Sequence, residues 1–322
     1  MNLINAESAA RLLLDNDRFL IITHRNPDGD TLGAGFGLCF ALCDLGKKAR
    51  VVNSDPLPKK FASLYESYKD EEYKPEFIIA VDTADTKLFG AALTSFAGKV
   101  NLCIDHHHGN SGYAESLCLD ADAASACEVV FDVLEAAGAA ITPKIAECLY
   151  TGIVTDTGCF RYSGTTPKTL CIASKLMETG IGYSAINRRI FETKTRTRVA
   201  LEMYAIRNTE YYLDSRCAFA AIPKTAADEM KVTDEDYDGL AALTTQVEGV
   251  DVGILVKEKE KGKFRISIRS AGHINVSEIT ENFGGGGHIQ AAGCSIDGKL
   301  EDVRMKLLAA VAKSMGIALF LV

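Results

Sequence analysis

The sequence lacks any C-x-x-C pair, although it contains ten cysteines in 322 residues. Zinc sites built on thiolates usually use such pairs, so their absence argues against a structural zinc site. Several cysteines lie inside apolar runs, such as Cys103 in NLCI and Cys171 in TLCIASKL. We therefore expect reduced, buried thiols with a structural role, as is typical of a reducing cytoplasm.

The chain also lacks positive charge in excess and a recognisable membrane segment. Its formal net charge is −8, which argues against a protein that coats long DNA or RNA, but not against a small nucleotide as ligand. No basic N-terminal region precedes a long apolar stretch, and the apolar residues 316–322 are too few to span a bilayer. We expect a cytoplasmic enzyme or binding protein without a membrane or a long nucleic acid as partner.

Three common catalytic and phosphate-binding motifs are missing as well. The glycine run 284–287 is followed by His288 rather than by Lys-Ser/Thr, so it is not a Walker A loop. It also lacks the spacing and the downstream acid of a dinucleotide-binding fingerprint. No G-x-S-x-G elbow is present, which argues against a serine hydrolase of that type.

What is present is a composition that can form full cores, with 47% hydrophobic and 24% charged residues. Short apolar runs alternate with helical patterns, such as residues 32–45 and 168–178. The runs lie at residues 19–23, 49–53, 77–81 and 101–104. This alternation predicts an α/β domain over residues 1–185, with a doubly wound parallel sheet.

The pattern of predicted helices and strands changes after this first domain. Residues 186–211 have a helical pattern rich in Arg and Thr, which we interpret as a helical linker. Residues 212–322 then predict a smaller α/β domain, with a helix that starts near His288. Its strands are expected at residues 211–213, 217–221, 250–256 and 264–270, and its other helices near 234–247, 276–282 and 298–315.

Potential metal ligands follow three of the apolar runs. His24 ends the first run, Asp82 follows FIIAV, and Asp105-His106-His107-His108 follows NLCI. In an open parallel sheet the ligand site lies at the carboxyl ends of the strands, so these side chains should converge. A single aspartate after a strand is more often a cap or turn residue, but three such strand ends are hard to explain by packing.

The loop after the first run adds two carboxylates. Pro27 and Gly29 favour a tight, irregular turn, within which His24, Asp28 and Asp30 can point into one space. Mixed nitrogen and oxygen donors without thiolates suit manganese, magnesium, iron or cobalt better than structural zinc. A further aspartate, Asp156 in TDTG, interrupts a helical run at residues 146–154.

These motifs resemble those of the DHH phosphoesterases. THRNPDGDTLG, VDTAD, IDHHHGN and TGIVTDTGCF match the four N-terminal motifs in order, and SIRS with FGGGGHIQAAG resembles the DHH-associated C-terminal domain. The resemblance covers nearly the whole chain. Its length and domain order look most like the nanoRNases, which degrade short oligoribonucleotides and dephosphorylate 3′-phosphoadenosine 5′-phosphate (pAp).

The resemblance implies a role for each matching residue. It implies two divalent ions, most readily Mn²⁺, with Mg²⁺ or Co²⁺ as alternatives. His107 would lie beside the scissile phosphate as a stabiliser or proton donor, and Asp105 would orient a ligand histidine. The metal ligands would be His24 and Asp28 for one ion, Asp30, His106 and Asp156 for the other, and Asp82 as a catalytic bridge.

The resemblance also implies that the second domain holds the terminal nucleotide, across a cleft between the domains. The expected substrate-binding residues are Arg269, Ser270, Gly285, Gly286, Gly287 and His288. The substrates would be short RNA oligonucleotides and pAp. Hydrolysis of a cyclic or linear dinucleotide, such as c-di-AMP or pApA, is the alternative, because it uses the same catalytic residues. The protein would act as a monomer or homodimer. A pyrophosphatase, a long-substrate exonuclease and a non-enzymatic nucleotide sensor are less favoured by these motifs.

Overall fold

The computed structural model describes residues 1–317, which form two compact units. The first unit covers Met1–Thr193, and the second begins at Lys194. Each unit has its own six-stranded sheet and its own buried apolar clusters. Residues 318–322, most of the apolar end of the chain, lie outside the described residues.

The first unit is built on a parallel sheet, as the sequence predicts. Its strand order is β1-β6-β5-β4-β2-β3, and every neighbouring pair is parallel. The strands are β1 (Asn2–Ile4), β2 (Phe19–Ile22), β3 (Ala49–Val52), β4 (Phe77–Val81), β5 (Leu102–Asp105) and β6 (Ser116–Leu119). The central strands are almost continuously apolar because both of their faces are covered.

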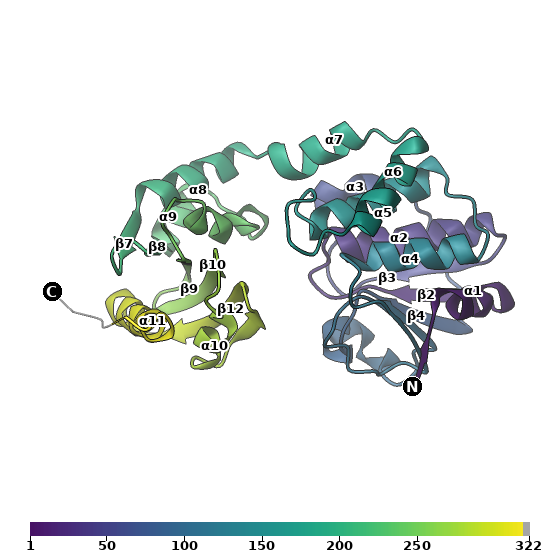
Figure 1. The fold of residues 1–322 in the computed structure, drawn as a ribbon, viewed down its shortest axis with the longest axis horizontal. Helices are drawn as coiled ribbons and strands as arrows, with labels where there is room; N and C mark the ends of the chain where they lie inside the picture. The colour runs from purple at the N-terminus through teal and green to yellow at the C-terminus, as the bar shows by residue number, and fades with distance from the viewer. Residues whose placement is uncertain (318–322) are drawn as a thin grey trace. The chain divides into compact units, whose positions relative to one another are not determined.

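The two faces of this sheet are covered by different elements. Ile21 and Ile104 belong to the cluster with α1, α2, α4 and α5, which lie along one face (Figure 1). Ile22 and Cys103 point the other way, toward two short 3₁₀ segments, because successive strand residues alternate between faces. The helices are α1 (Ala6–Asp15), α2 (Gly29–Asp44), α3 (Ala62–Tyr65), α4 (Ala126–Ala136), α5 (Pro143–Asp156), α6 (Pro167–Glu178) and α7 (Tyr183–Asn187).

Helices α2 and α5 approach each other closely because α2 carries glycines four residues apart. A Cβ at Gly33 would lie 2.4 Å from the Cys148 carbonyl oxygen, and one at Gly29 would lie 2.4 Å from the Thr155 hydroxyl. Residues four apart share one face of a helix, so the glycines form a smooth seam for α5. This seam holds the first turn of α2 beside the last turn of α5.

The second unit has a mixed sheet in the order β11-β12-β10-β9-β8-β7. Only β8 and β9 pair in parallel among its described strands. The strands are β7 (Thr209–Tyr212), β8 (Cys217–Ile222), β9 (Val252–Glu260), β10 (Lys263–Ser270), β11 (Gly286–His288) and β12 (Ala291–Asp297). One face packs on α10 (Val276–Glu281) and α11 (Leu300–Ser314), and a short helix α9 spans Lys224–Glu229.

The residues predicted as a helical linker, 186–211, are divided between the two units. A π-helical turn spans Arg188–Glu192, and α8 (Arg196–Arg207) follows it. Helix α8 buries Leu201 and Ala205 in an apolar cluster with β8. The Thr195 hydroxyl and the Arg198 guanidinium hydrogen-bond Asp236, and these contacts hold the start of α8 to the second unit.

Two local predictions in the second unit are wrong. No helix starts near His288, because the glycine run forms β11 and turns back antiparallel onto β12. The predicted helix over residues 234–247 is two 3₁₀ segments, Glu235–Tyr237 and Leu240–Thr245. Gly239 lies between them in the left-handed region, with φ +69°, which ends the first segment.

The ten cysteines are free, as expected, and most of them are buried. Cys103 lies in a buried strand, whereas Cys171 is exposed on α6, contrary to its expected burial. An apolar run on an amphipathic helix still turns one residue in three or four toward solvent, which explains the difference. Among residues 1–317, no helix combines the length and the apolar character that a membrane span requires.

The seam between α2 and α5 leads to a stability prediction. We expect Gly33→Ala to lower the free energy of unfolding by about 1–3 kcal/mol, because its Cβ meets backbone of α5 that cannot rotate away. Alanine is otherwise preferred over glycine in a helix by about 1 kcal/mol, so the loss is opposite in sign to propensity. Urea unfolding measures the effect. Gly164→Ala is the control, because its Cβ would meet nothing within 4 Å. Equal stability of the two variants would contradict the seam.

Candidate metal centre

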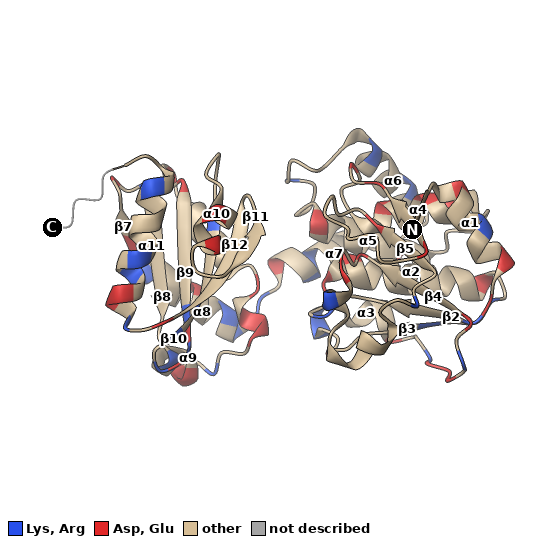
Figure 2. Cartoon of the chain, turned by 90° about the horizontal axis from the view of Figure 1, so that it is seen from below, with Lys and Arg blue, Asp and Glu red and all other residues tan. Residues whose placement is uncertain are grey.

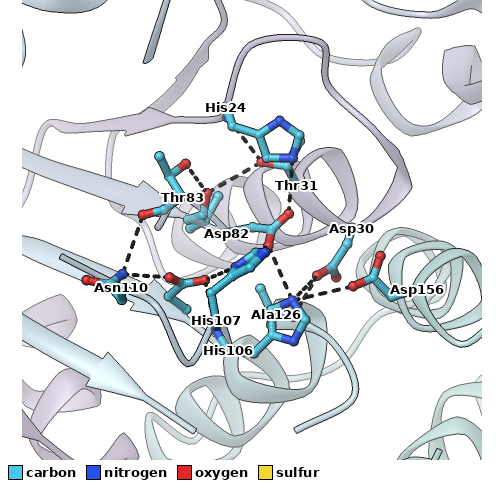
Figure 3. Close-up of polar contacts among 12 residues, drawn as sticks. His24, Asp30, Thr31, Asp82, Thr83, His106, His107, Asn110, Ala126 and Asp156 are labelled. Carbon is cyan, nitrogen blue, oxygen red and sulfur yellow. Dashed lines mark hydrogen bonds and ion pairs between the residues drawn. The ribbon is translucent and has the colours of Figure 1, made fainter. Parts of the chain in front are cut away.

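The candidate site lies where the chain reverses its direction across the first sheet. From β2 the chain moves outward to β3 and then returns past β2 to β4, β5 and β6. Strands β2 and β4 are therefore the neighbours at the switch point of the sheet, where ligands of open α/β sheets bind. His24 follows β2, Asp82 follows β4, and Asp105 ends β5, so the predicted strand ends do converge (Figure 3).

The loop after β2 brings His24 and Asp28 together. Asn26 adopts a left-handed conformation, with φ +52°, and Asp28 then caps α2 by accepting the N–H groups of Asp30 and Thr31 at 3.1 Å each. The same oxygen, Oδ1, lies 3.6 Å from His24 Nε2. The ring is oriented from behind, where Nδ1 lies 2.8 Å from the Arg25 carbonyl oxygen.

Asp30 is held by the first turn of α4. Its side chain is fully buried, and its two oxygens accept the N–H groups of Ala126 at 2.6 Å and Cys127 at 3.0 Å. The N-terminal amides of a helix stabilise a negative charge, so α4 keeps this buried carboxylate in place. Figure 3 shows Asp30 between Ala126 and the Asp156 side chain.

Asp82 occupies a strained backbone position. Its φ is +51°, which is uncommon for a residue with a side chain and costs on the order of 1 kcal/mol. Its N–H still donates to the Ile104 carbonyl oxygen at 3.0 Å, which continues the pairing of β4 with β5. The strained turn leaves the buried carboxylate with Oδ2 3.3 Å from His24 Nε2 and Oδ1 3.6 Å from His106 Nε2.

His106 lies at the centre of a second group of donors. Its Nε2 is 3.8 Å from Asp30 Oδ2 and 3.4 Å from Asp156 Oδ2, and Asp156 is the last residue of α5. Its Nδ1 lies 3.2 Å from the Ala123 carbonyl oxygen, which fixes the ring. The ligand atoms of Asp30, His106 and Asp156 all lie within 4.8 Å of one another, and so do those of His24, Asp28 and Asp82.

These separations fit donors on a shared cation better than hydrogen bonds. Donor atoms about 2.1 Å from one ion lie roughly 3.0–4.2 Å apart, depending on the angle at the ion. The five distances from the His24 and His106 Nε2 atoms to the carboxylates range from 3.3 to 3.8 Å. Asp82 Oδ1 and His106 Nε2 are buried without a hydrogen-bond partner. Buried polar atoms of this kind need a partner, and a divalent ion satisfies both.

The protonation states also indicate a site that attracts positive charge. Burial opposes the charged imidazoles, yet the carboxylates of Asp28 and Asp82 raise the pKa of His24 to about 11. Asp82, Asp30 and Asp156 likewise raise the pKa of His106 to about 10 against the effect of burial. Burial and the Asp82 charge raise the pKa of Asp30 to about 7. The carboxylates thus favour bound protons, and metal ions can replace protons in a site of this kind.

Asp105 and His107 form a separate pair next to the candidate metal ligands. Asp105 is fully buried, and its Oδ1 accepts a hydrogen bond from His107 Nδ1 at 2.8 Å. Asp105 therefore orients His107, not His106, the histidine predicted to bind a metal, whose Nδ1 faces Ala123. Although His107 Nδ1 also lies 3.6 Å from Asp82 Oδ1, it is already engaged by Asp105 and would have to leave it to bind a metal.

A groove of about 630 Å³ in the second unit contains some of the predicted substrate-binding residues. Arg269, Gly285 and Gly286 line it, together with Arg265 and Ser267. Residues 265, 267 and 269 alternate along β10 and so share one face of the sheet. Arg265 was not among the predicted substrate-binding residues, although this period of two was visible in FRISIRS.

The other predicted substrate-binding residues do not line this groove. Ser270 falls on the opposite side of the alternation, is buried, and accepts the Gly272 N–H. His288 is exposed on β11. A Cβ at Gly287 would lie 2.5 Å from the Ala291 carbonyl oxygen, so this glycine is needed for the close approach of β11 to β12. The glycine run is thus partly a requirement of strand pairing.

Comparisons with known proteins agree with this architecture. The model of the DHH family, N-terminal domain, matches residues 18–153, and that of the DHHA1 domain matches residues 218–316. A protein named bifunctional oligoribonuclease and PAP phosphatase NrnA, from Thermus thermophilus, is 31% identical over 92% of this chain and 89% of its own length. A Bacillus subtilis protein of the same name is 27% identical over 87% of this chain and 90% of its own length.

Solved structures share the fold. An exopolyphosphatase-related protein from Bacteroides fragilis has a TM-score of 0.89 and 23% identity, covering 96% of both chains. A Thermus thermophilus RecJ in complex with Mn²⁺ has a TM-score of 0.57 and 16% identity, covering 97% of this chain and 55% of its own. The ordered motifs, the two matched domains and the relative at 31% identity lead to one conclusion. The chain belongs to the DHH family of phosphoesterases and carries a DHHA1 domain in its second unit.

Proposed function

We propose that this chain hydrolyses short oligoribonucleotides to mononucleotides and dephosphorylates pAp to AMP. The set of histidines and aspartates at the switch point carries the proposal, because it offers two groups of metal donors that share Asp82. The names of the relatives from Thermus thermophilus and Bacillus subtilis support this substrate class over the dinucleotide alternative.

The proposed cofactors are two divalent ions, Mn²⁺ in the first place and Mg²⁺ or Co²⁺ as substitutes. The RecJ structure of the same fold contains Mn²⁺, and the nitrogen and oxygen donors found here suit that ion. His24 and Asp28 would hold one ion, and Asp82 would bridge to the second. The second ion would be held by Asp30, His106 and Asp156.

When bound, such ions acidify water and offset the negative charge of a phosphoryl group. The protein residues supply the rest of the chemistry. Asp28 and Asp30, fixed by the first turns of α2 and α4, hold the donor geometry rigid before substrate arrives. His107, held by Asp105, presents its ring beside Asp82 and is the candidate group to stabilise or protonate the leaving oxygen.

In the second unit, the groove face of β10 is proposed to bind the nucleotide. Arg265 and Arg269 offer guanidinium groups that can form paired hydrogen bonds with a phosphate, and Ser267 lies between them on the strand. A Cβ at Gly286 would meet nothing within 4 Å, so this side of the backbone is open to a ligand. Figure 2 shows lysines and arginines scattered among Asp and Glu in each unit, an arrangement that supports short rather than long substrates.

The cytoplasm is the proposed site of this activity. Ten free cysteines support it, because thiols persist in a reducing compartment.

The first functional prediction concerns metal. Exhaustive chelation should abolish pAp hydrolysis, and Mn²⁺ should restore it. Without metal ions, the carboxylates of the site would repel the negatively charged phosphate. Mn²⁺ at about a hundred times its Kd should also stabilise the fold by about 2.7 kcal/mol, seen as a rise in Tm. Full activity of the chelated and dialysed protein would contradict the proposal.

The second prediction separates catalysis from nucleotide binding. Asp82→Asn should lower kcat/KM by more than a hundredfold, since Asp82 contributes an oxygen to each of the two proposed metal sites. Arg269→Ala should lower kcat/KM by about ten- to a hundredfold, the usual effect of a lost charged hydrogen bond of about 1.5–3 kcal/mol. His288→Ala is the control with a small effect, because His288 does not line the groove. Similar losses for Asp82→Asn and His288→Ala would count against this division.

The third prediction concerns substrate length. We expect kcat/KM to fall steeply as RNA grows from two to about twenty nucleotides, while pAp remains a good substrate, because the net charge of −8 opposes the binding of a long polyanion. An RNA ladder with pAp, pApA and c-di-AMP measured alongside provides the comparison. Efficiency that is equal or rises with length would point to a processive exonuclease, and a preference for c-di-AMP would favour the dinucleotide alternative.

A further inference from the structure

The hydrogen bonds behind His107 include Asn110, which was not among the predicted site residues. Asn110 Nδ2 donates to Asp105 Oδ2 at 2.6 Å, while Asp105 Oδ1 accepts from His107 Nδ1 and from the His106 N–H at 2.8 Å each. Both carboxylate oxygens of the buried Asp105 are therefore satisfied. Figure 3 labels Asn110 and His107, the two ends of this hydrogen-bond chain.

The orientation of the Asn110 amide is determined by its surroundings. Its Oδ1 accepts the Gly112 N–H at 2.8 Å, so the NH₂ group must face Asp105. Its own N–H donates to the His107 carbonyl oxygen at 3.1 Å, and the next residue, Ser111, donates to the Ala84 carbonyl oxygen at 2.8 Å. The loop is thus tied both to the histidine motif and to the turn after Asp82.

The hydrogen bonds from Asn110 through Asp105 to His107 determine which ring nitrogen of His107 is free to contact a substrate. Nδ1 is bound by Asp105, and no hydrogen bond or ion pair of Nε2 is found within residues 1–317. The ring packs against His106, with centroids 4.6 Å apart, and 35% of the His107 side chain remains exposed. Nε2 is therefore the nitrogen left for a substrate, and its direction depends on how firmly Asp105 is held.

We propose that Asn110 is a positioning residue for the hydrolytic reaction, holding Asp105 so that His107 Nε2 faces the leaving oxygen of the scissile phosphoester. The inference rests on the proposed function. Water forms the new P–O bond, and the electron pair of the broken P–O bond goes to the leaving oxygen. That oxygen takes a proton from His107 Nε2, the water releases one to solvent, and His107 recovers its proton from solvent.

A purely structural role for Asn110 would need only its turn with Gly112. The two roles can be separated, because Asn110→Asp keeps an acceptor for the Gly112 N–H but replaces the amide donor to Asp105 with a second carboxyl group. The same amide also lies 3.5 Å from the Thr83 carbonyl oxygen and 3.6 Å from Cys103 Sγ, so Asn110→Ala, which removes the whole group, is measured alongside.

Asn101 provides a matched control. Its Oδ1 accepts the Ile78 N–H at 2.9 Å and its Nδ2 donates to Glu115 at 3.1 Å, so Asn101→Asp makes the same chemical change elsewhere in the unit.

The test compares two leaving groups with the Mn²⁺-loaded full chain. One substrate is a short RNA, whose leaving ribose oxygen needs a proton. The other is the p-nitrophenyl ester of a 5′-mononucleotide, whose leaving group departs without one. Asn110→Asp and Asn110→Ala should lower kcat on RNA by about ten- to a hundredfold with little change in KM. Their kcat on the nitrophenyl ester should fall by less than about threefold.

Two further variants define the expected pattern. His107→Gln should show the same selectivity with a larger loss, and adding Asn110→Ala to it should lower kcat no further, because both act through one group. Asn101→Asp should match the wild type on both substrates. Equal losses on both substrates in the Asn110 variants, or a weakened Mn²⁺ affinity in them, would overturn the positioning role.

A second measurement does not depend on catalysis. In the metal-free full chain, nitrogen-detected NMR of the imidazoles at one fixed pH should show the His107 Nδ1 proton hydrogen-bonded in the wild type and altered in Asn110→Ala. An unchanged His107 signal overturns the inference, and Asn110→Asp serves the same test if the alanine variant does not fold. A wild type inactive on both substrates would instead refute the proposed function and leave the NMR result to decide on Asn110.

Discussion

The mutual repulsion of four carboxylates at one end of a parallel sheet is the constraint on which the first unit depends. The ligand oxygens of Asp28 and Asp82, and those of Asp30 and Asp156, lie within 4.8 Å of each other. Two like charges at that distance repel by about 3.5 kcal/mol at an effective dielectric constant of about 20. The fold must offset several such repulsion energies. The groups around the carboxylates are therefore as much a part of the site as the carboxylates themselves.

The first unit meets this constraint with backbone groups more than with side-chain cations. Asp28 and Asp30 each accept two N–H groups from the first turn of a helix, α2 and α4 respectively. The glycine seam brings α5 close enough for Asp156 to reach the same space. The surrounding carboxylates raise the pKa of the His24 and His106 imidazoles, so the site favours positive charge. The apolar core, the glycines and the strained Asp82 all serve one arrangement of donors.

The parallel-sheet domain and the convergence of the histidines and aspartates could be predicted because their signals are local. Each ligand motif directly follows an apolar run, and parallel strands carry such residues to one edge of the sheet. The short strands β1 and β6 were missed, since three or four residues are too few to show a period. Helix α1 was not predicted either, although Asn5 accepts the Ser8 N–H as its cap. These elements are stabilised mainly by tertiary packing.

Other errors came from contacts that no sequence pattern contains. The glycine run before His288 is compatible with a loop, a helix start or a strand, and only the approach of β12 selects the strand. Ser270 is different, because the period of two along β10, which is visible in the sequence, already places it on the other face from Arg269. The partner of Asp105 depends on a ring orientation, and the role of Asn110 depends on the conformation of a loop. Side-chain contacts of this kind follow from the fold rather than from the motif.

The central claim is that two ions share Asp82 between the two groups of donors. Anomalous diffraction at the manganese edge, from crystals of the full chain grown with Mn²⁺, tests it most directly. The account predicts two anomalous peaks, one bound by His24, Asp28 and Asp82 and the other by Asp30, His106, Asp156 and Asp82. A single peak, or peaks that do not contact Asp82, would contradict it.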